Sequence, residues 1–293
     1  MGAVLHRRLG ELVADLHVRD GEMRDRVPDG LHQARVTSRR LRSVLVTFRP
    51  VLVRELTEPI RGDLRWLALS LGEARDAEVA HARLRRLTLE VAPTAEHDAL
   101  LGRIDGVLEG MGRAAQEKVD ATLATDRYRV LQAGLDRIVA HPPWAPGASD
   151  PAAEVLPPLL EREQRRLHRR VIRAHEVRDH PAAYDEAVHD VRKAAKRLRY
   201  AWEVAEPVLG EHASGQRAAA REVTRLLGER QDIVLTRALL PRLEADAAAE
   251  GETTAPWERL RRLESERAAQ IASDTLHMLK SGTFSAGVAA PEK

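Results

Sequence analysis

A short segment rich in arginine, with one histidine near its start, occurs twice in the sequence. The first copy is LHQARVTSRRLRSVLVTFRPVL, residues 31–52, and the second is VHDVRKAAKRLRYAWEVAEPVL, residues 188–209. A guanidinium group donates paired hydrogen bonds to phosphate or carboxylate oxygens, and a neutral imidazole can donate one more. Residues of these types, spaced about a helical turn apart, could therefore bind an anion that carries many oxygen atoms.

The spacing places the basic residues of each copy on one face of a helix. Consecutive residues in an α-helix are about 100° apart, so the basic positions fall within about 80° of the histidine. The predicted ridges are His32, Arg35, Arg39 and Arg42 in the first copy and His189, Arg192, Lys196 and Arg199 in the second. Flanking positions are Arg40, Lys193 and Arg197. The opposite faces are apolar and are predicted to be buried.

A charged helix face is most often simply solvated, which is the plainest explanation of these ridges. Solvated faces usually mix charges, however, because like charges one turn apart repel each other. Residues 31–54 contain six arginines and no carboxylate, and residues 191–202 contain five lysines and arginines and no carboxylate. This segregation costs stability, so we expect an anion to compensate it, and a series of cations suits a repeating anion.

The elements that must position these residues are predicted to be helices. The chain of 293 residues is 43% hydrophobic, 31% charged and only 3% aromatic, and strong helix formers are abundant. Helices are expected at about 3–26, 29–54, 57–90, 95–140, 152–179, 182–208, 212–248 and 255–280. No strand pattern is evident. The expected fold class is therefore all-α, with eight main helices.

Two collinear matches between the halves indicate an internal duplication. After the basic segments, LRWLALSLGEARD (64–76) aligns with AREVTRLLGERQD (220–232) at almost the same offset. We predict a single domain over residues 1–285, followed by a flexible tail at 286–293. Within it, a first repeat at 1–140 and a second at 152–285 flank a proline-rich linker at 141–151. These two four-helix units would be related by a pseudo-two-fold axis and would line a basic central groove.

Composition excludes several classes of site. The formal net charge is only +2, so any basic surface requires local segregation of charge. The sequence has no cysteine, which excludes disulfides, thiolate metal sites and a thiol nucleophile. Residues 1–20 mix charge into every turn, and no run of about 18 apolar residues occurs. We therefore expect a cytoplasmic protein with no signal peptide and no membrane contact.

The duplicated motifs resemble the paired signature of the CHAD domain family (conserved histidine α-helical domain). The resemblance lies in His-x-x-Arg-x-x-x-Arg-Arg-Leu-Arg in the first half, His-x-x-Arg-Lys-x-x-Lys-Arg-Leu-Arg-Tyr in the second, and the segments LGEARD and LGERQD. It covers about residues 5–280, with Gln231 departing from the pattern where the first copy has Arg75. No Glu-x-Glu-x-Lys motif of a fused triphosphatase domain precedes it, so a stand-alone member of the family is expected.

The resemblance implies an eight-helix fold with internal pseudo-symmetry, a basic surface that binds inorganic polyphosphate, and association with polyphosphate granules in bacteria. The two ridges and their flanking residues match the family motifs and are the implied binding residues. Further arginines could extend the surface: Arg65, Arg75, Arg165, Arg169 and Arg221. For Arg165 and Arg169, a solvated helix face is an equally good explanation.

Three other functions stay open: non-specific nucleic-acid binding, binding of an acidic protein segment, and a phosphohydrolase or phosphotransferase that uses the paired histidines. Hydrolysis by a metal is disfavoured because arginines around His189 and Asp190 would repel divalent cations. Single-strand binding is disfavoured because the ridges carry no aromatic residue for stacking. We predict a non-catalytic protein without cofactor or metal, whose partners are polyphosphate, other polyanions, and sulfate or phosphate ions.

Overall fold

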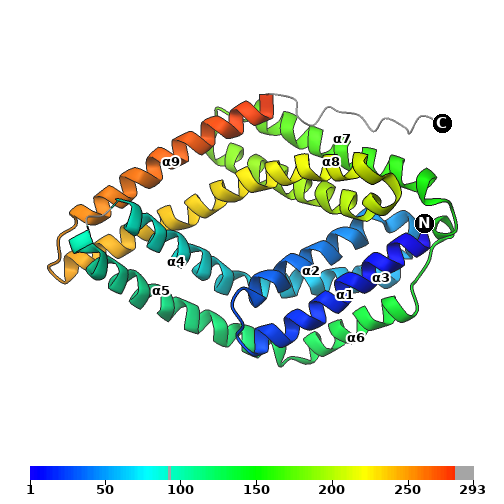
Figure 1. Cartoon of the computed structure of the whole chain (residues 1–293), viewed down its shortest axis with the longest axis horizontal. Helices are drawn as coiled ribbons and strands as arrows, with labels where there is room; N and C mark the ends of the chain where they lie inside the picture. Colours follow the sequence, from blue (N-terminus) through cyan, green and yellow to red (C-terminus); the bar gives the residue numbers. More distant parts are fainter. Residues whose placement is uncertain (92–93, 281–293) are drawn as a thin grey trace. The chain divides into compact units, whose positions relative to one another are not determined.

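The computed structural model describes residues 1–91 and 94–280, and its described elements are almost entirely helical (Figure 1). The helices are α1 (Gly2–Arg24), α2 (Gly30–Thr47), α3 (Arg54–Ser70), α4 (Gly72–Val91), α5 (Thr94–Leu123), α6 (Asp126–Ala140), α7 (Ala152–Glu176), α8 (Pro181–Ala249) and α9 (Ala255–Lys280). Two 3-10 helices, η1 (Arg49–Val51) and η2 (Pro146–Ala148), and one antiparallel bridge between Leu52 and Trp144 complete them. The all-α prediction is confirmed.

The chain forms two compact units. Among the described residues, unit 1 comprises residues 1–70, 122–225 and 278–280, and it contains α1, α2, α3, α6, α7 and the first part of α8. Unit 2 comprises residues 71–121 and 226–277, and it contains α4, most of α5, the last part of α8 and most of α9. Each unit takes segments from both predicted repeats, so the compact units do not coincide with the sequence repeats.

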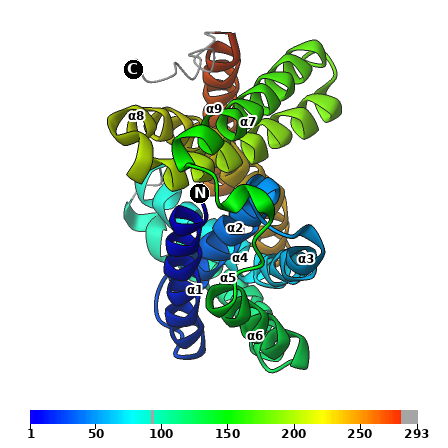
Figure 2. The same ribbon diagram turned by 90° about the vertical axis from the view of Figure 1, so that its right-hand side faces the viewer.

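In unit 1, helix α2 packs between α1 and α3, and α6 packs against both α1 and α3 (Figure 2). Apolar residues three or four positions apart on these helices meet in one core, as amphipathic helices require. Among its most deeply buried leucines are Leu5, Leu9, Leu16, Leu41, Leu45, Leu64 and Leu67. Helix α7 is tied to the end of α2, where a guanidinium nitrogen of Arg162 donates to the carbonyl oxygen of Thr47 at 2.6 Å.

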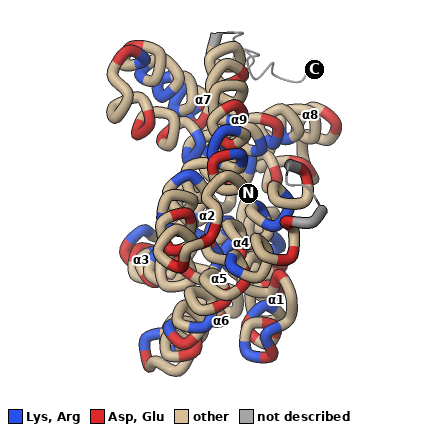
Figure 3. Tube along the Cα trace, turned by 90° about the vertical axis from the view of Figure 1, so that its left-hand side faces the viewer, with Lys and Arg blue, Asp and Glu red and all other residues tan. Residues whose placement is uncertain are grey.

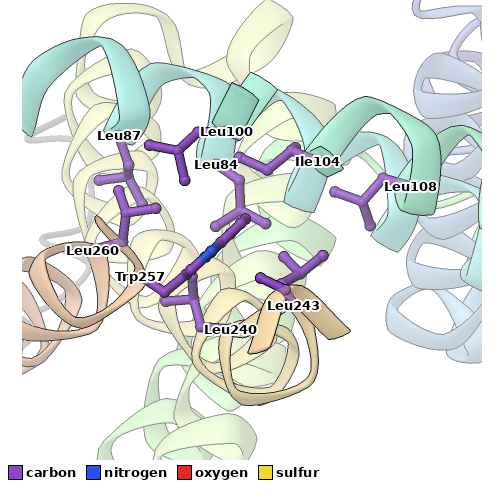
Figure 4. Packing of buried hydrophobic residues seen from close by; sticks show 10 residues of the cluster. Leu84, Leu87, Leu100, Ile104, Leu108, Leu240, Leu243, Trp257 and Leu260 are labelled. Carbon is purple, nitrogen blue, oxygen red and sulfur yellow. The ribbon is translucent and has the colours of Figure 1, made fainter. Parts of the chain in front are cut away.

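Unit 2 has its own core, in which leucines of α4, α5 and α8 pack in one cluster with Trp257 of α9 (Figure 4). Inside this unit Arg83 of α4 donates two parallel hydrogen bonds, each 2.7 Å long, to the carboxylate of Glu264 of α9. The hydroxyl of Thr236 on α8 donates to the same carboxylate. Glu264 is fully buried, so this network supplies the partners that a carboxylate needs in an apolar interior.

The described residues of the first half form six α-helices instead of the four expected. The helix predicted at 57–90 is divided between α3 and α4 at Leu71, next to Gly72, a residue type that weakens helix interiors. The helix predicted at 95–140 is divided between α5 and α6. There Thr125 forms an N-cap, with its side-chain oxygen accepting from the backbone N–H of Tyr128 at 3.2 Å. The eight-helix count was therefore wrong in this half.

Helix α2 ends earlier than predicted, at Thr47 instead of residue 54. Pro50 follows shortly afterwards, and a proline disfavours helical geometry at the residue before it. The start of α2 is fixed by a close approach: a Cβ atom at Gly30 would lie 2.8 Å from the Cβ atom of Glu22. Only glycine therefore fits at this position without displacing α1.

The break predicted between residues 208 and 212 is present inside α8. Gly210 has φ 55° and ψ −134°, which ends one helix and starts the next. This backbone conformation is strongly disfavoured for residues with a side chain. The predicted tail at 286–293 lies outside the described residues. Among the helices that are described, none combines the length and apolar character needed to cross a bilayer.

Candidate anion-binding site

The site is built on α2 and on the part of α8 before Gly210, both in unit 1. The apolar faces predicted for these helices are buried, and the residues concerned are Ala34, Leu41, Val44, Leu45, Phe48 and Leu52 in the first copy and Val191, Ala195, Leu198, Trp202 and Ala205 in the second. Leu209, which belongs to the apolar face predicted for the second copy, is partly exposed. Because the apolar faces are fixed in the core, the ridge residues are directed away from its centre.

Lys196 on α8 shows that the two ridges meet. Its pKa is lowered to about 6, first by burial and then by the positive charges of Arg39, Arg192, Arg199 and Arg35, in that order. Two of these arginines belong to α2 and two to α8. Charges repel strongly enough to shift a pKa only over short distances. We call the five residues Arg35, Arg39, Arg192, Lys196 and Arg199 the cationic cluster.

Arg42 extends the cationic cluster toward α3. Its pKa is lowered by burial and then by the charges of Arg65, Arg61 and Arg39. The sequence predicted that Arg65 could extend the basic surface, but it did not predict this for Arg61. Arg61 lies one turn before Arg65 on α3, so the two side chains share a helix face. This spacing could have identified Arg61 from the sequence.

Three cations of the site have no carboxylate partner in the described part of the chain. Among the residues that the structure describes, Arg39, Arg42 and Lys196 form no ion pair with Asp or Glu. The Nε atom of Arg39 is buried and has no hydrogen-bond partner in the described part of the chain. Partly buried cations without counter-charges are unfavourable. Elsewhere the charges are mixed, as Figure 3 shows along α1 and α6.

The carboxylate of Glu203 on α8 borders the cationic cluster. It accepts a hydrogen bond from Arg8 of α1 at 2.8 Å, and its oxygens lie 3.4 Å from Arg40 of α2 and 3.8 Å from Arg199 of α8. Its side chain is only 11% exposed, so these charges interact with little screening by water. Glu203 therefore ties three helices together at the margin of the site.

Arg199 is held in place by several neighbours. Its guanidinium carbon lies 4.7 Å from the ring centroid of Tyr200, and one of its nitrogens donates to the hydroxyl of Thr224 at 3.2 Å. The guanidinium carbon of Arg40 lies 5.9 Å from the same ring. Tyr200 is itself buried, so it orients arginines and offers no exposed face for stacking on a base.

Two flanking residues have other partners. Arg197 donates to the buried carboxylate of Glu163 on α7 at 2.6 Å and to the hydroxyl of Thr47 at 3.3 Å. Burial lowers the pKa of Arg197 to about 10, although Glu163 opposes that shift. We therefore assign Arg197 to packing between α7 and α8, in contrast to the prediction from the sequence. Lys193 is exposed and donates to Asp190 at 3.2 Å.

The two histidines lie at the start of the ridges. His32 is half-buried on α2. The pKa of His189 is lowered by burial and by the charges of Lys193 and Arg192, while Asp190 raises it. The imidazole of His189 is therefore neutral near pH 7, and a neutral imidazole can donate one hydrogen bond to an anion.

The remaining arginines that were predicted to extend the surface differ in their exposure and partners. Arg165 and Arg169 are exposed on α7, and Arg165 lies 3.4 Å from Glu161. Arg221 is exposed on α8. Arg75 lies on α4 in unit 2 and donates to Glu78 at 3.0 Å. Among residues 1–91 and 94–280, no three His, Asp or Glu side chains are grouped as metal ligands would be.

Comparisons with known proteins agree with the motifs. The family model described as CHAD domain matches residues 7–241. Two similar curated proteins are the uncharacterized proteins MT2285 and Rv2226 of two Mycobacterium tuberculosis strains, CDC 1551 and H37Rv. Each is 30% identical over 256 residues, which cover 85% of this chain and 47% of the relative. The chain thus spans about half the length of these relatives.

Two solved structures share the fold. The crystal structure of the CHAD domain from the plant Ricinus communis aligns with a TM-score of 0.73 and 23% identity, covering 100% of this chain and 93% of that one. PptA from Streptomyces chartreusis aligns with a TM-score of 0.75 and 16% identity, covering 95% of this chain and 98% of that one.

Proposed function

The chain belongs to the CHAD domain family, and from this premise we propose that it binds inorganic polyphosphate at the cationic cluster without transforming it chemically. The observation that carries the proposal is the position of Lys196 among arginines of both motif copies, with no carboxylate paired to it in the described residues. An anion from outside the chain would supply the missing counter-charge. Arginine is the side chain best suited to phosphate oxygens, because its donors form a planar fork.

A polymeric phosphate fits better than a single ion. The cations come from two helices, and Arg42 continues the surface toward Arg61 and Arg65 on α3. Several phosphates joined in one chain would contact these groups at a high effective concentration, so each further contact adds affinity. Neutralising several phosphates also releases counterions, so affinity should fall steeply with salt.

Binding of this kind would bring the protein to polyphosphate granules in the cytoplasm. A fluorescent fusion of the chain should gather at granules in cells that accumulate polyphosphate. It should disperse when arginines of the cationic cluster are replaced.

The decisive experiment is a calorimetric titration of the chain with polyphosphates of defined length. Affinity should increase with chain length until the surface is filled, and long polyphosphate should displace DNA or an acidic peptide at a lower concentration than orthophosphate does.

The matched control is the double variant Arg129→Ala and Arg137→Ala, which removes two exposed positive charges from α6 in the same unit. It should bind as the natural chain does. Equal affinities for orthophosphate and a long chain would overturn the proposal, and tighter binding of DNA would favour a nucleic-acid ligand.

A further inference from the structure

Lys196 differs chemically from the other members of the cationic cluster. Arginine stays protonated at any pH that a protein tolerates, so the four guanidinium groups of the cationic cluster keep their charges. A lysine that is buried or crowded by cations can release its proton instead. The amine of Lys196 is the only group of the cationic cluster that can lower the mutual repulsion by titrating.

The surroundings of Lys196 favour the neutral amine. On α8, Arg192 and Arg199 lie about one helical turn before and after Lys196. Helix α2 lies against this part of α8, because Arg40 of α2 is 3.4 Å from Glu203 and 5.9 Å from the ring centroid of Tyr200. The charges of Arg39 and Arg35 on α2 therefore act on the amine together with those of Arg192 and Arg199. His189 lies in the same field, because the charge of Lys196 lowers the pKa of that imidazole. Two carboxylates on α8 already have other partners: Glu203 accepts from Arg8, and Asp190 accepts from Lys193.

We propose that Lys196 is neutral in the unliganded protein near neutral pH and takes up one proton when a polyphosphate binds. The site would then gain one positive charge when the polyanion binds. The proposal rests on the function proposed above and adds a regulation to it: binding is linked to pH through one amine.

The size of the effect follows from the pKa of Lys196, about 6 in the free protein. At pH 8 about 1% of the amine would be protonated without ligand. Phosphate oxygens beside it favour the ammonium form and would return its pKa toward the ordinary value, so nearly one proton is taken up. By linkage, affinity for polyphosphate should then fall about tenfold for each unit of pH between about 7 and 9.

The test is calorimetric titration with long-chain polyphosphate at pH 8 in two buffers of different ionisation enthalpy, for example Tris and HEPES. The difference in apparent enthalpy between the buffers gives the number of protons taken up. We expect about one proton for the natural chain, because at pH 8 the end groups of polyphosphate are almost fully ionised. The natural chain is used throughout as the reference for the variants.

Two variants test whether Lys196 is the group that takes up the proton. Lys196→Met has no group to titrate, and Lys196→Arg keeps a permanent charge, so both should take up almost no proton at pH 8. The Arg variant should also bind with nearly constant affinity between pH 7 and 9. It keeps the test decisive in case the Met variant binds too weakly to titrate. His189→Gln should still take up about one proton, since that imidazole is neutral at pH 8 in the free protein.

Proton uptake that is unchanged in Lys196→Arg, or absent from the natural chain, would overturn the inference. Binding of long polyphosphate without proton uptake would leave the proposed function intact. No binding of polyphosphate at any pH would instead overturn the proposed function, so the two failures are distinguishable.

Discussion

Lys196 on α8 and Arg39 on α2 lie close enough for the guanidinium of Arg39 to lower the pKa of the lysine amine more than any other single charge does. The two residues occupy corresponding positions in the duplicated motif. The motif copies therefore act on one surface of unit 1, although more than a hundred residues separate them in the chain. This relationship makes the contribution of each copy separately testable.

Each motif copy should contribute to polyphosphate affinity. In the first copy the test is the double variant Arg39→Ala and Arg42→Ala, and in the second it is Lys196→Ala and Arg199→Ala. A hydrogen bond to a charged group contributes about 1.5 kcal/mol or more, so each double variant should bind about 100-fold more weakly at fixed ionic strength. Circular dichroism should show an intact fold, because these residues lie on the side of their helices opposite the buried apolar face. Affinity within twofold of the natural chain in both variants would place the site elsewhere.

Replacing Lys196 by methionine should stabilise the unliganded protein. The pKa of Lys196 is about 6 when folded and about 10.5 when unfolded, so the unfolded state binds more protons at every pH between these values. The penalty that Lys196 imposes therefore grows as pH falls from 10.5 toward 6, and Lys196→Met should gain about 1 kcal/mol or more at pH 7. Urea unfolding at pH 7 and pH 10 would measure this, and the gain should be smaller at pH 10. A loss of stability at pH 7 would mean that Lys196 makes a favourable contact in the free protein.

The ion pair of Arg197 and Glu163 should affect stability without affecting binding. Arg197→Met would leave the buried carboxylate of Glu163 without its main partner, which costs about 3 kcal/mol. Polyphosphate affinity should change little, because Arg197 is engaged with α7. Lys193→Ala is the matched control, since Lys193 is exposed and its loss should change stability by less than about 0.5 kcal/mol. A large loss of affinity in Arg197→Met would return this arginine to the binding surface.

The buried network of unit 2 should control opening of that unit. Glu264→Gln would leave Arg83 with a weaker acceptor in an apolar interior, where Arg83 is only 5% exposed. Hydrogen exchange should accelerate in α4 and α9, while exchange in α1 and α2 should change little. Uniform acceleration over the whole chain would show instead that the two units unfold together.

The kink in α8 should depend on glycine at position 210. Gly210 has a positive φ but open space around its Cα, so Gly210→Ala tests the backbone conformation alone. We expect a loss of about 1–3 kcal/mol. Gly215→Ala, in the helical part of α8 and also in open space, should be neutral or stabilising, because alanine favours helices. Equal effects of the two variants would contradict this account of the kink.

The sequence predicted the helical fold and the buried faces of α2 and α8, because an apolar stripe at helical spacing is typical of a helix that packs against a core. It missed the divisions at Leu71 and at Thr125 because neither break contains a proline. Thr125 followed by Asp126 is nevertheless an N-cap pattern that could have indicated the second division. The compact units could not be predicted, since they combine segments that are distant in the chain.

Within the site, spacing predicted which residues share a helix face but not which partners they find. Arg197 lies only one position from Lys196, yet it meets Glu163 of α7, whose approach the sequence of α8 does not encode. Arg61 was missed because it lies outside both motif copies, and its proximity to Arg42 arises from packing of α2 on α3. The internal symmetry and the basic groove stay predictions.

Glu203 interacts with arginines of α1, α2 and α8 at the edge of the proposed anion-binding surface. Removing this negative charge would make the surface more attractive to distant anions, yet it would also release the side chains and helices that the carboxylate now restrains. The stronger long-range attraction would raise the affinity for an anion, whereas the loss of preorganised side chains would lower it. Adding net positive charge to such a surface is therefore no simple route to a tighter binder.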